Sequence, residues 1–225
     1  MSTPKTKETQ YQVCVEAASE RGFERLGLRS SESWHEDPKH LVFRLSRYKF
    51  VAKMLAGRQH VLEVGCGDAF GTRIVQAEVG KLTGTDFDAV FIEDVKTRMV
   101  PRWRFDVFTH DILDGPVPGA YDGIYALDVL EHIRSADERV FLKNAFAPLH
   151  QHGAAIIGIP SLESQPYASV QSKVGHINCK SAPELKSLML EYFHNVFIFS
   201  MNDEVVHTGF HKMANYVFAI GAGRI

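Results

Sequence analysis

The stretch that most constrains the fold is residues 61–71, which read Val-Leu-Glu-Val-Gly-Cys-Gly-Asp-Ala-Phe-Gly. The run 61–64 is short, mostly apolar and typical of a strand that is buried on both faces of a parallel sheet. Gly65 and Gly67 follow, and closely spaced glycines let a turn approach a nucleotide-like ligand before a helix begins. Phe70 stands where a dinucleotide-binding fingerprint needs glycine, which disfavours a dehydrogenase. The stretch therefore predicts a strand, a ligand-binding turn and a helix.

Strand-like and helix-like segments alternate after this turn. The expected strands are 61–64, 81–85, 103–107, 121–127, 153–159, 196–199 and 216–220. The expected helices are 71–79, 88–95, the segment after 127 through about 149, and one that begins after the capping residue Ser181. This alternation predicts an α/β fold with a doubly wound, mostly parallel sheet, closed by an antiparallel pair, whose ligands bind at the carboxyl ends of the strands.

Residues 1–57 precede the first core strand and predict a tail and a helical cap rather than a separate domain. Within them, 1–7 read as a frayed polar tail, 9–28 as a broken helix, 29–39 as a loop and 40–56 as an amphipathic helix. Trp34 and His35 lie in the expected loop, where they either close over a ligand or anchor the neighbouring helices. The remaining residues, 58–225, are expected to form the ligand-binding domain.

Composition narrows the functional classes. With 225 residues and 45% hydrophobic content, the chain can bury the core of one α/β domain. Its net charge of −2 and pI near 6.6 provide no global basic surface, so we expect no nucleic-acid partner. The three cysteines form no C-x-x-C pair, which argues against a disulfide framework and a zinc site. A polar N-terminus and the lack of a long apolar run predict a cytoplasmic protein that does not enter a membrane.

Acidic residues stand at the ends of three successive expected strands. They are Glu63, Asp86 and Asp111. The Asp86 carboxylate can accept hydrogen bonds from both ribose hydroxyls of an adenosine, Phe87 can lie against the adenine face, and Asp111 can accept from the adenine amino group. Each residue also has a structural alternative, as a turn former, a helix cap or a core aromatic residue. Three acids at these positions together predict an adenosine-containing ligand.

Four motifs along the chain resemble, in order, those of the class I S-adenosylmethionine-dependent methyltransferases. They are Glu63-x-Gly65-x-Gly67, Gly84-Thr85-Asp86, His110-Asp111-Ile112 and the run 126–132, Ala-Leu-Asp-Val-Leu-Glu-His. Within that class, the chain is similar to the small-molecule enzymes of the ubiquinone-biosynthesis O-methyltransferase type. The resemblance implies a Rossmann-like methyltransferase fold of seven strands with the last one antiparallel, and it makes 58–225 the catalytic domain. One departure is Ala69, where the family turn often has a third glycine.

The resemblance also implies which residues bind S-adenosylmethionine and, after reaction, S-adenosylhomocysteine. These residues lie in the glycine turn or at strand ends: Glu63, Gly65, Cys66, Gly67, Asp86, Phe87, Asp111, Ile112 and Leu127. The glycine turn is expected to face the methionine part, and Leu127 to offer its backbone carbonyl to the cofactor's amino group.

Methyl transfer to an acceptor requires residues in addition to those that bind the cofactor. The methyl group of a sulfonium is already electrophilic, so the protein has to hold the acceptor in line and remove its proton. His132 and His176 are the candidate bases, because the pKa of histidine suits this task near neutral pH. Their structural alternatives are a helix N-terminal residue packed on the sheet and a solvated loop residue.

The same region raises the question of a metal. Asp128, Glu131 and His132 carry oxygen and nitrogen ligands that could hold Mg²⁺, and the ubiquinone-type enzymes have a similar cluster linked to a divalent metal. Alternatively, Asp128 caps the following helix and Glu131 is solvated in its first turn. We favour the second interpretation and predict no metal.

These features predict O-methylation of a small polar acceptor such as a sugar or a similar hydroxyl-bearing metabolite. The segments 161–179 and 202–211 are polar and too long for tight turns, so they are expected to build the acceptor pocket. N-methylation of a small molecule or a nucleic acid is the enzymatic alternative, although the run after 126 is not of the Asn-Pro-Pro-Tyr type. A non-catalytic cofactor-binding protein is the other alternative, and a homodimer is left open.

Overall fold

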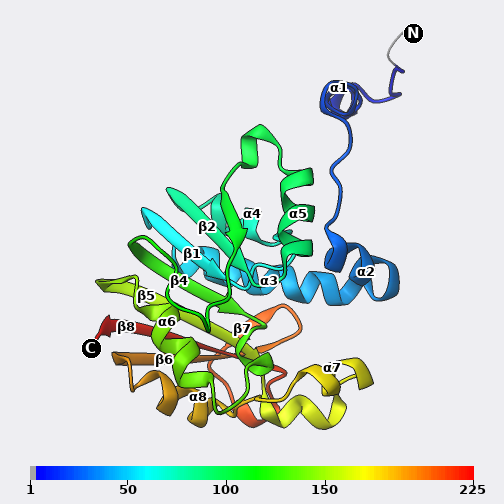
Figure 1. The fold of residues 1–225 in the computed structure, drawn as a ribbon. Helices are drawn as coiled ribbons and strands as arrows, with labels where there is room; N and C mark the ends of the chain where they lie inside the picture. Colours follow the sequence, from blue (N-terminus) through cyan, green and yellow to red (C-terminus); the bar gives the residue numbers. More distant parts are fainter. Residues whose placement is uncertain (1–3) are drawn as a thin grey trace.

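Eight strands form one sheet, in the order β3-β2-β1-β4-β5-β8-β6-β7, in the computed structural model, which describes residues 4–225 (Figure 1). The strands are β1 His60–Val64, β2 Lys81–Asp86, β3 Asp106–Thr109, β4 Tyr121–Leu127, β5 Leu149–Pro160, β6 Phe193–Asn202, β7 Val205–His207 and β8 Tyr216–Arg224. β1 to β5 run parallel, whereas β8 is antiparallel to both its neighbours, β5 and β6. The predicted doubly wound α/β fold with an antiparallel last strand is confirmed. Residues 1–3 of the predicted tail lie outside the described residues.

Helices cover both faces of this sheet (Figure 1). The α-helices are α1 Gln12–Arg21, α2 Leu28–Glu36, α3 Pro38–Met54, α4 Thr72–Gln76, α5 Ala89–Arg98, α6 Glu138–Phe146, α7 Val170–Gly175 and α8 Ala182–Met189. The 3-10 turns are η1 Thr9–Tyr11, η2 Pro101–Trp103, η3 Leu130–His132, η4 Leu162–Tyr167 and η5 His211–Met213. α1 has no buried residue and projects from the rest of the molecule (Figure 1). Within residues 4–225, no helix has both the length and the apolar content needed to span a membrane.

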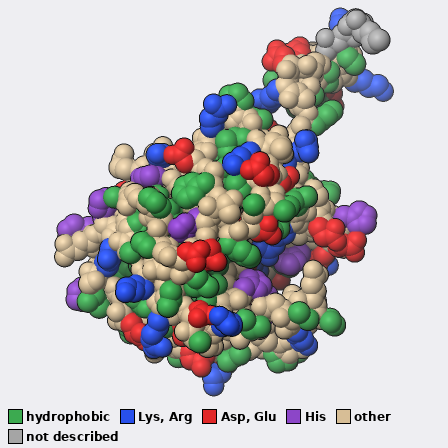
Figure 2. Space-filling model, in the orientation of Figure 1, with side chains coloured by type: hydrophobic (Ala, Val, Ile, Leu, Met, Phe, Trp, Pro, Cys, Tyr) green, Lys and Arg blue, Asp and Glu red, His purple; other side chains and the backbone are tan. Residues whose placement is uncertain are grey.

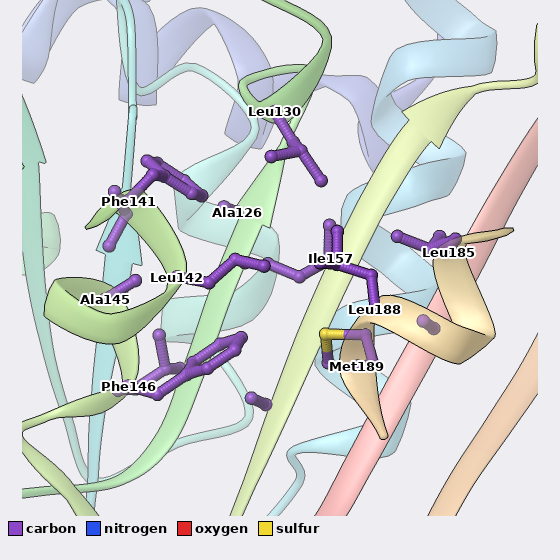
Figure 3. Packing of buried hydrophobic residues seen from close by; sticks show 14 of the residues in the cluster. Ala126, Leu130, Phe141, Leu142, Ala145, Phe146, Ile157, Leu185, Leu188 and Met189 are labelled. Carbon is purple, nitrogen blue, oxygen red and sulfur yellow. The ribbon is translucent and has the colours of Figure 1, made fainter. Parts of the chain in front are cut away.

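Alternate side chains of the central strands enter the two layers of the core. Val61 and Tyr125 belong to the layer that includes α3 and α4, whereas Leu62 and Ile124 pack with α6 and α8. Figure 3 shows the second layer, where side chains of α6 and α8 approach Ile157 of β5 from two sides. Because both faces of the strands are buried, their sequences are almost continuously apolar.

Several predicted boundaries are wrong. The third strand is Asp106–Thr109 rather than 103–107, because Pro101 starts a 3-10 turn that includes Trp103. The helix predicted through about 149 ends at Phe146, and the next residues turn directly into β5. The predicted loop 161–179 contains η4 and the short helix α7.

The sheet also has one strand more than the seven that the sequence predicts. β7 lies in the segment 202–211 and pairs with β6, with Asn202 opposite Val205. Asp203 has a φ of 50°, a left-handed conformation of the kind that two-residue hairpin turns need. The connection between β6 and β8 is thus too long for a tight hairpin, as predicted, but the sequence did not predict the short hairpin with β7 inside it.

The predicted loop 29–39 is mainly the helix α2, whose inward face is polar. Ser30 is fully buried, and its backbone N–H donates to Oδ2 of Asp68 in the glycine turn at 2.6 Å. Arg44 of α3 donates to the hydroxyl groups of Ser30 at 3.0 Å and Ser33 at 2.8 Å. The bond to Asp68 docks α2 onto the turn, and the two bonds from Arg44 join α3 to α2 within the cap that these helices form. The division of the chain at residue 57 stays a prediction.

Candidate active site

The glycine turn after β1 lies against the strands on either side of it. The carbonyl oxygen of Thr85 accepts hydrogen bonds from the backbone N–H groups of Gly65 at 2.8 Å and Cys66 at 2.9 Å. Gly65 has a φ of 77°, and a Cβ atom there would lie 2.3 Å from Cγ2 of Val129, which follows β4. Glycine therefore lets the turn after β1 approach the turn after β4. Burial raises the pKa of the Cys66 thiol well above its usual value, so this side chain is uncharged.

Ala69 adopts the conformation that glycine usually provides. Its φ is 49°, and a left-handed non-glycine residue is strained by about 1–2 kcal/mol. The methyl group is buried in a cluster with Ile92 and Val95 of α5, which offsets part of this strain. The shape of the turn is thus kept although the third glycine is missing.

Asp86, at the end of β2, is held beside this turn. Its Oδ2 accepts a hydrogen bond from the backbone N–H of Gly67 at 2.8 Å, and its Oδ1 accepts from that of Asp88 at 2.9 Å. The two bonds fix the carboxylate at the carboxyl end of the sheet, where the ligands of doubly wound folds bind.

Glu63 is buried beneath the turn. Its Oε2 accepts a hydrogen bond from the hydroxyl group of Thr72 at 2.6 Å. Burial raises the pKa of Glu63 to about 7, although the hydroxyl groups of Thr72, Tyr125 and Tyr48 act in the opposite direction. Glu63 is therefore close to half ionised at neutral pH.

The other predicted cofactor residues differ in their exposure. Phe87 is 73% exposed, so one face of its ring is free to stack on a ligand. Oδ1 of Asp111 accepts a hydrogen bond from the backbone N–H of Leu113 at 2.9 Å, which is the turn-forming alternative named for this residue. Ile112 and Leu127 are buried, the latter at the end of β4.

Asp128, directly after β4, pairs with the cap. Nη1 of Arg47 donates to both of its carboxylate oxygens, at 2.7 Å and 2.8 Å, and a guanidinium nitrogen of Arg29 lies 3.9 Å away. Burial alone would raise the pKa of Asp128, but these two guanidinium groups hold it below its usual value. Asp128 is therefore an ionised partner of Arg47, and its side chain caps no described helix.

Glu131, in η3, has no charged partner of the kind that Asp128 has in Arg47. Its side chain is fully buried, and neither carboxylate oxygen has a hydrogen-bond partner among residues 4–225. Burial and the nearby Asp128 carboxylate hold the pKa of Glu131 well above its usual value. The solvated position named for Glu131 as an alternative is wrong.

Backbone hydrogen bonds bring the two predicted histidines together. The carbonyl oxygen of Glu131 accepts from the N–H groups of Ile177 at 2.9 Å and Asn178 at 3.0 Å, which ties the chain after α7 to η3. As a result, the ring centroids of His132 and His176 lie 5.4 Å apart. His176 is thus not the solvated loop residue of the structural alternative.

Each histidine ring is oriented through its Nδ1 atom. Nδ1–H of His132 donates to the carbonyl oxygen of Gly175 at 2.8 Å, and Nδ1–H of His176 donates to Oε1 of Gln165 at 3.0 Å. In a neutral ring this leaves Nε2 unprotonated. Burial and the neighbouring His132 lower the pKa of His176, which favours its neutral form.

Two cavities adjoin these histidines. One of about 590 Å³ lies between the cap and α7, and one of about 310 Å³ lies between Asp128, Glu131 and η4. Both are bordered by Arg29, His40, Ser172 and His176. Figure 2 shows histidine side chains beside a hollow on the right-hand part of this face. The segment 161–179 contributes to both cavities, whereas Trp34, His35 and 202–211 contribute to neither.

Three basic residues at this place are not among the predicted site residues. They are Arg29, His40 and Arg47, all from the cap. The sequence holds one signal for them: His40, Arg44 and Arg47 recur at spacings of four and three residues on α3, and such residues share one face of a helix.

Comparisons with known proteins agree with the motifs. Residues 61–153 match the family model described as a methyltransferase domain. A probable S-adenosylmethionine-dependent methyltransferase of Mycolicibacterium smegmatis (strain ATCC 700084 / mc(2)155) is 26% identical over 144 residues, covering 63% of this chain and 54% of that protein. Residues 61–153 are therefore similar to a methyltransferase domain. The chain spans about half the length of the curated relatives that it matches.

Solved structures show the same fold for the methyltransferase domain and its surroundings. The N-methyltransferase NodS from Bradyrhizobium japonicum WM9, in complex with S-adenosyl-L-homocysteine, has a TM-score of 0.63 at 16% identity and covers 84% of this chain and 90% of its own. The methyltransferase domain of bacterial CtHen1-C has a TM-score of 0.67 at 16% identity and covers 80% of this chain and 98% of its own. The predicted enzyme class and cofactor, S-adenosylmethionine, are confirmed at the level of the domain, whereas the role of each site residue stays a prediction.

Proposed function

We propose that the protein transfers the methyl group of S-adenosylmethionine to a hydroxyl oxygen of a small polar acceptor, such as a sugar. The observation that supports this most directly is the pair His132 and His176, whose ring centroids lie 5.4 Å apart beside two cavities at the carboxyl end of β4. Membership of the ubiquinone-type O-methyltransferases and a cytoplasmic location stay predictions.

Cofactor binding is assigned to the edge of the sheet formed by β1, β2 and β4. Gly65, Cys66 and Gly67 would follow the methionine part, and the fixed Asp86 carboxylate would accept from the ribose hydroxyls. Phe87 and Asp111 would contact the adenine. The close approach of Gly65 to Val129 supports this assignment, because it brings the first and fourth strand ends to one place.

The acceptor is assigned to the cavities below the cap. Ser164, Gln165 and Asn215 provide neutral hydrogen-bonding groups there, and Arg29 and His40 provide cationic or protonatable ones. Such a lining suits an acceptor with several hydroxyl groups.

Methyl transfer then needs one proton removed. The acceptor oxygen forms its bond to the methyl carbon as the carbon–sulfur bond breaks, and S-adenosylhomocysteine leaves as a neutral thioether. The hydroxyl proton passes to an unprotonated Nε2 atom of His132 or His176, which their Nδ1 hydrogen bonds keep available. Positioning within the cavity supplies the remaining acceleration.

A panel of sugars, nucleotide sugars and phenols, each with a matched amine analogue, tests the proposal through formation of S-adenosylhomocysteine. Hydroxyl acceptors should turn over and their amine analogues should not. His132→Ala and His176→Ala should each lower kcat by about 100-fold or more, while cofactor affinity stays within about twofold.

His207→Ala is the matched control, since Nε2–H of His207 donates to Oδ1 of Asn202 in the β7 hairpin and His207 borders neither cavity. It should retain full activity. Preferential methylation of the amines would overturn the assignment of oxygen as the acceptor atom, and full activity of both active-site variants would overturn the histidine roles.

A further inference from the structure

We propose that Arg29 and His40, both from the cap, bind a carboxylate or phosphate group of the acceptor in the smaller cavity. The acceptor of the proposed methyl transfer would then be an anionic hydroxyl compound, such as a sugar acid or a sugar phosphate. The inference deepens the proposed function and rests on it only for the identity of the bound molecule, because binding of an anion is measured without methyl transfer.

Arg29 provides the observation that leads to this assignment. It lies in the first turn of α2, borders both cavities and has a side chain that is 46% exposed. Its one ion-pair contact within residues 4–225 is with Oδ2 of Asp128 at 3.9 Å, which is beyond hydrogen-bond distance. That carboxylate already accepts two hydrogen bonds from Arg47, at 2.7 Å and 2.8 Å. The guanidinium of Arg29 is therefore available to an outside anion, and its planar shape fits a carboxylate or a phosphate through two parallel hydrogen bonds.

His40 lies on α3 and borders the same two cavities. Partial burial lowers its pKa, and three guanidinium groups act in the same direction against the single Asp128 carboxylate; they belong to Arg47, Arg44 and Arg29. His40 therefore lies in a region with an excess of positive charge. An anion bound in this region would favour the protonated ring, which could then donate a hydrogen bond to it.

The acidic residues nearby do not cancel this charge in the smaller cavity. Asp128 is paired with Arg47, and burial together with the Asp128 carboxylate raises the pKa of Glu131, which leaves Glu131 uncharged. Three further acids are exposed and border the larger cavity but not the smaller one: Glu32, Glu36 and Asp37. In the smaller cavity, Arg29 and His40 therefore have no ionised acid left with which to pair.

Neutral hydrogen-bond donors lie in the same wall. Ser172 of α7 and Asn215, which directly precedes β8, both border the smaller cavity. Oγ of Ser172 accepts a hydrogen bond from the hydroxyl group of Ser169 at 3.0 Å, so the hydrogen of its own hydroxyl group can be donated to a ligand. The cavity volume of about 310 Å³ is at the lower end of the range for small-molecule sites, which suits a single sugar ring with one charged group.

The position of Arg29 relative to the two histidines links the anion to methyl transfer. Arg29 and His176 border both cavities, and His132 borders the larger one. An acceptor whose charged group is bound by Arg29 would therefore present its hydroxyl groups to the histidine pair. Because Arg29 would contribute affinity for the acceptor and not proton removal, its loss should raise KM for an anionic acceptor more than it lowers kcat.

Titration with inorganic phosphate and with acetate tests the site in the full chain. The protein is saturated with S-adenosylhomocysteine, so that the place of the cofactor's own carboxylate is filled, and nuclear magnetic resonance of the histidine rings follows binding. The wild type should bind at least one of the two anions with a Kd of about 1–20 mM, and the pKa of His40 should rise on binding. The anion that binds more tightly identifies the charged group of the acceptor.

Arg29→Met removes the guanidinium and should weaken anion binding by about 10-fold or more. Arg29→Lys keeps the charge without the planar group and should bind with intermediate affinity. Arg139→Met is the matched control, since Arg139 pairs with Glu191 at 2.8 Å and borders neither cavity, and it should bind anions as the wild type does. Circular dichroism checks that each variant is folded, and affinity for S-adenosylhomocysteine should be unchanged in all three.

Three results would each overturn the proposal. The first is that the wild type binds neither anion saturably, and the second is that Arg29→Met binds them as tightly as the wild type does. The third is that Arg29→Met loses as much affinity for S-adenosylhomocysteine as for the anions, because the guanidinium would then bind the carboxylate of the cofactor.

Matched acceptors separate this inference from the proposed function. Glucuronate and glucose 6-phosphate are compared with glucose through formation of S-adenosylhomocysteine. Methylation of neutral hydroxyl acceptors only, with the same KM in the wild type and Arg29→Met, would refute the anionic acceptor and leave the proposed function intact. Anion binding through Arg29 without methylation of any hydroxyl acceptor would support the anion site while refuting the proposed function.

Discussion

The buried Glu63 should make the stability of the protein fall as pH rises through neutrality. Burial raises the pKa of Glu63 from 4.5 to about 7, so the folded state holds this proton more tightly than the unfolded chain does. The contribution to stability is fully present below about pH 4.5 and is lost as the pH rises through about 7. One pKa unit is worth about 1.4 kcal/mol, so the full effect is about 3 kcal/mol, of which about 2.5 kcal/mol falls between about pH 5 and pH 8.

Glu63→Gln isolates this contribution. The amide has nearly the same shape, can still accept the hydrogen bond from Thr72, and does not titrate. Urea unfolding of both proteins, without cofactor, at several values between about pH 5 and pH 8 measures the difference. The free energy of unfolding of the variant, relative to that of the wild type, should increase by about 2.5 kcal/mol from the lower to the upper end of this range.

Histidines also titrate in this range, but they do so in both proteins, and their contribution cancels in the difference between them. A difference in unfolding free energy that stays constant within about 0.5 kcal/mol from pH 5 to pH 8 would refute the reasoning. It would mean that Glu63 has the same proton affinity in the folded and unfolded states.

Three further substitutions follow from contacts described above. Asp86→Ala should weaken S-adenosylmethionine binding by about 1–3 kcal/mol in calorimetric titration, because polar partners are left unpaired. Arg47→Ala should lower the free energy of unfolding in urea by about 3–5 kcal/mol, since it leaves the buried Asp128 carboxylate without the guanidinium nitrogen that donates to both of its oxygens. Gly71→Ala would place a Cβ atom 2.4 Å from the ring of Tyr48 and should lower stability by about 1–3 kcal/mol, seen as a fall in Tm.

Matched controls exist for the last two. Lys53→Ala removes an exposed ion pair at 3.4 Å and should change stability by less than about 1 kcal/mol. Gly115→Ala adds a Cβ atom with nothing within 4 Å and should change it by less than about 0.5 kcal/mol. If Arg47→Ala lowered the free energy of unfolding no more than Lys53→Ala does, Arg47 and Asp128 would not form a buried ion pair. Unchanged cofactor affinity in Asp86→Ala would contradict the assignment of Asp86 to the ribose.

The sheet could be predicted because its signals are local. Buried parallel strands have almost continuously apolar sequences, and the glycines that follow β1 occupy positions where the backbone has a positive φ. The end of β2 at Asp86 and the whole of β4 agree with the prediction.

α2 could not be predicted in the same way, because its inward face is not apolar. Ser30 is the buried residue of this helix, and it is satisfied by Asp68, which is 38 positions away in the sequence. A helix that packs through hydroxyl groups lacks the apolar period on which sequence-based assignment depends.

In the candidate site, too, single residues could be predicted from the sequence, whereas contacts between distant residues could not. The sequence predicts His132 and His176 as separate candidates, but they lie close together because backbone hydrogen bonds tie the chain after His176 to Glu131. Arg47 and Asp128 are 81 positions apart. Because of the bond between them, Asp128 is an ion-pair partner, whereas the sequence motif suggested a metal ligand or a helix cap. Long-range pairs of this kind leave no pattern in a single chain.

One carboxylate, that of Asp68, belongs to the glycine turn and also holds the first turn of α2 in the cap. Coupling between two such events is reciprocal, so a ligand that orders the turn favours the docked cap, and the docked cap in turn retains the ligand. With the cofactor bound at this turn as proposed, exchange of S-adenosylhomocysteine for S-adenosylmethionine would be slowed by the docked cap. The rate of cofactor exchange in the proposed reaction would then depend on Asp68, which borders neither of the cavities assigned to the acceptor.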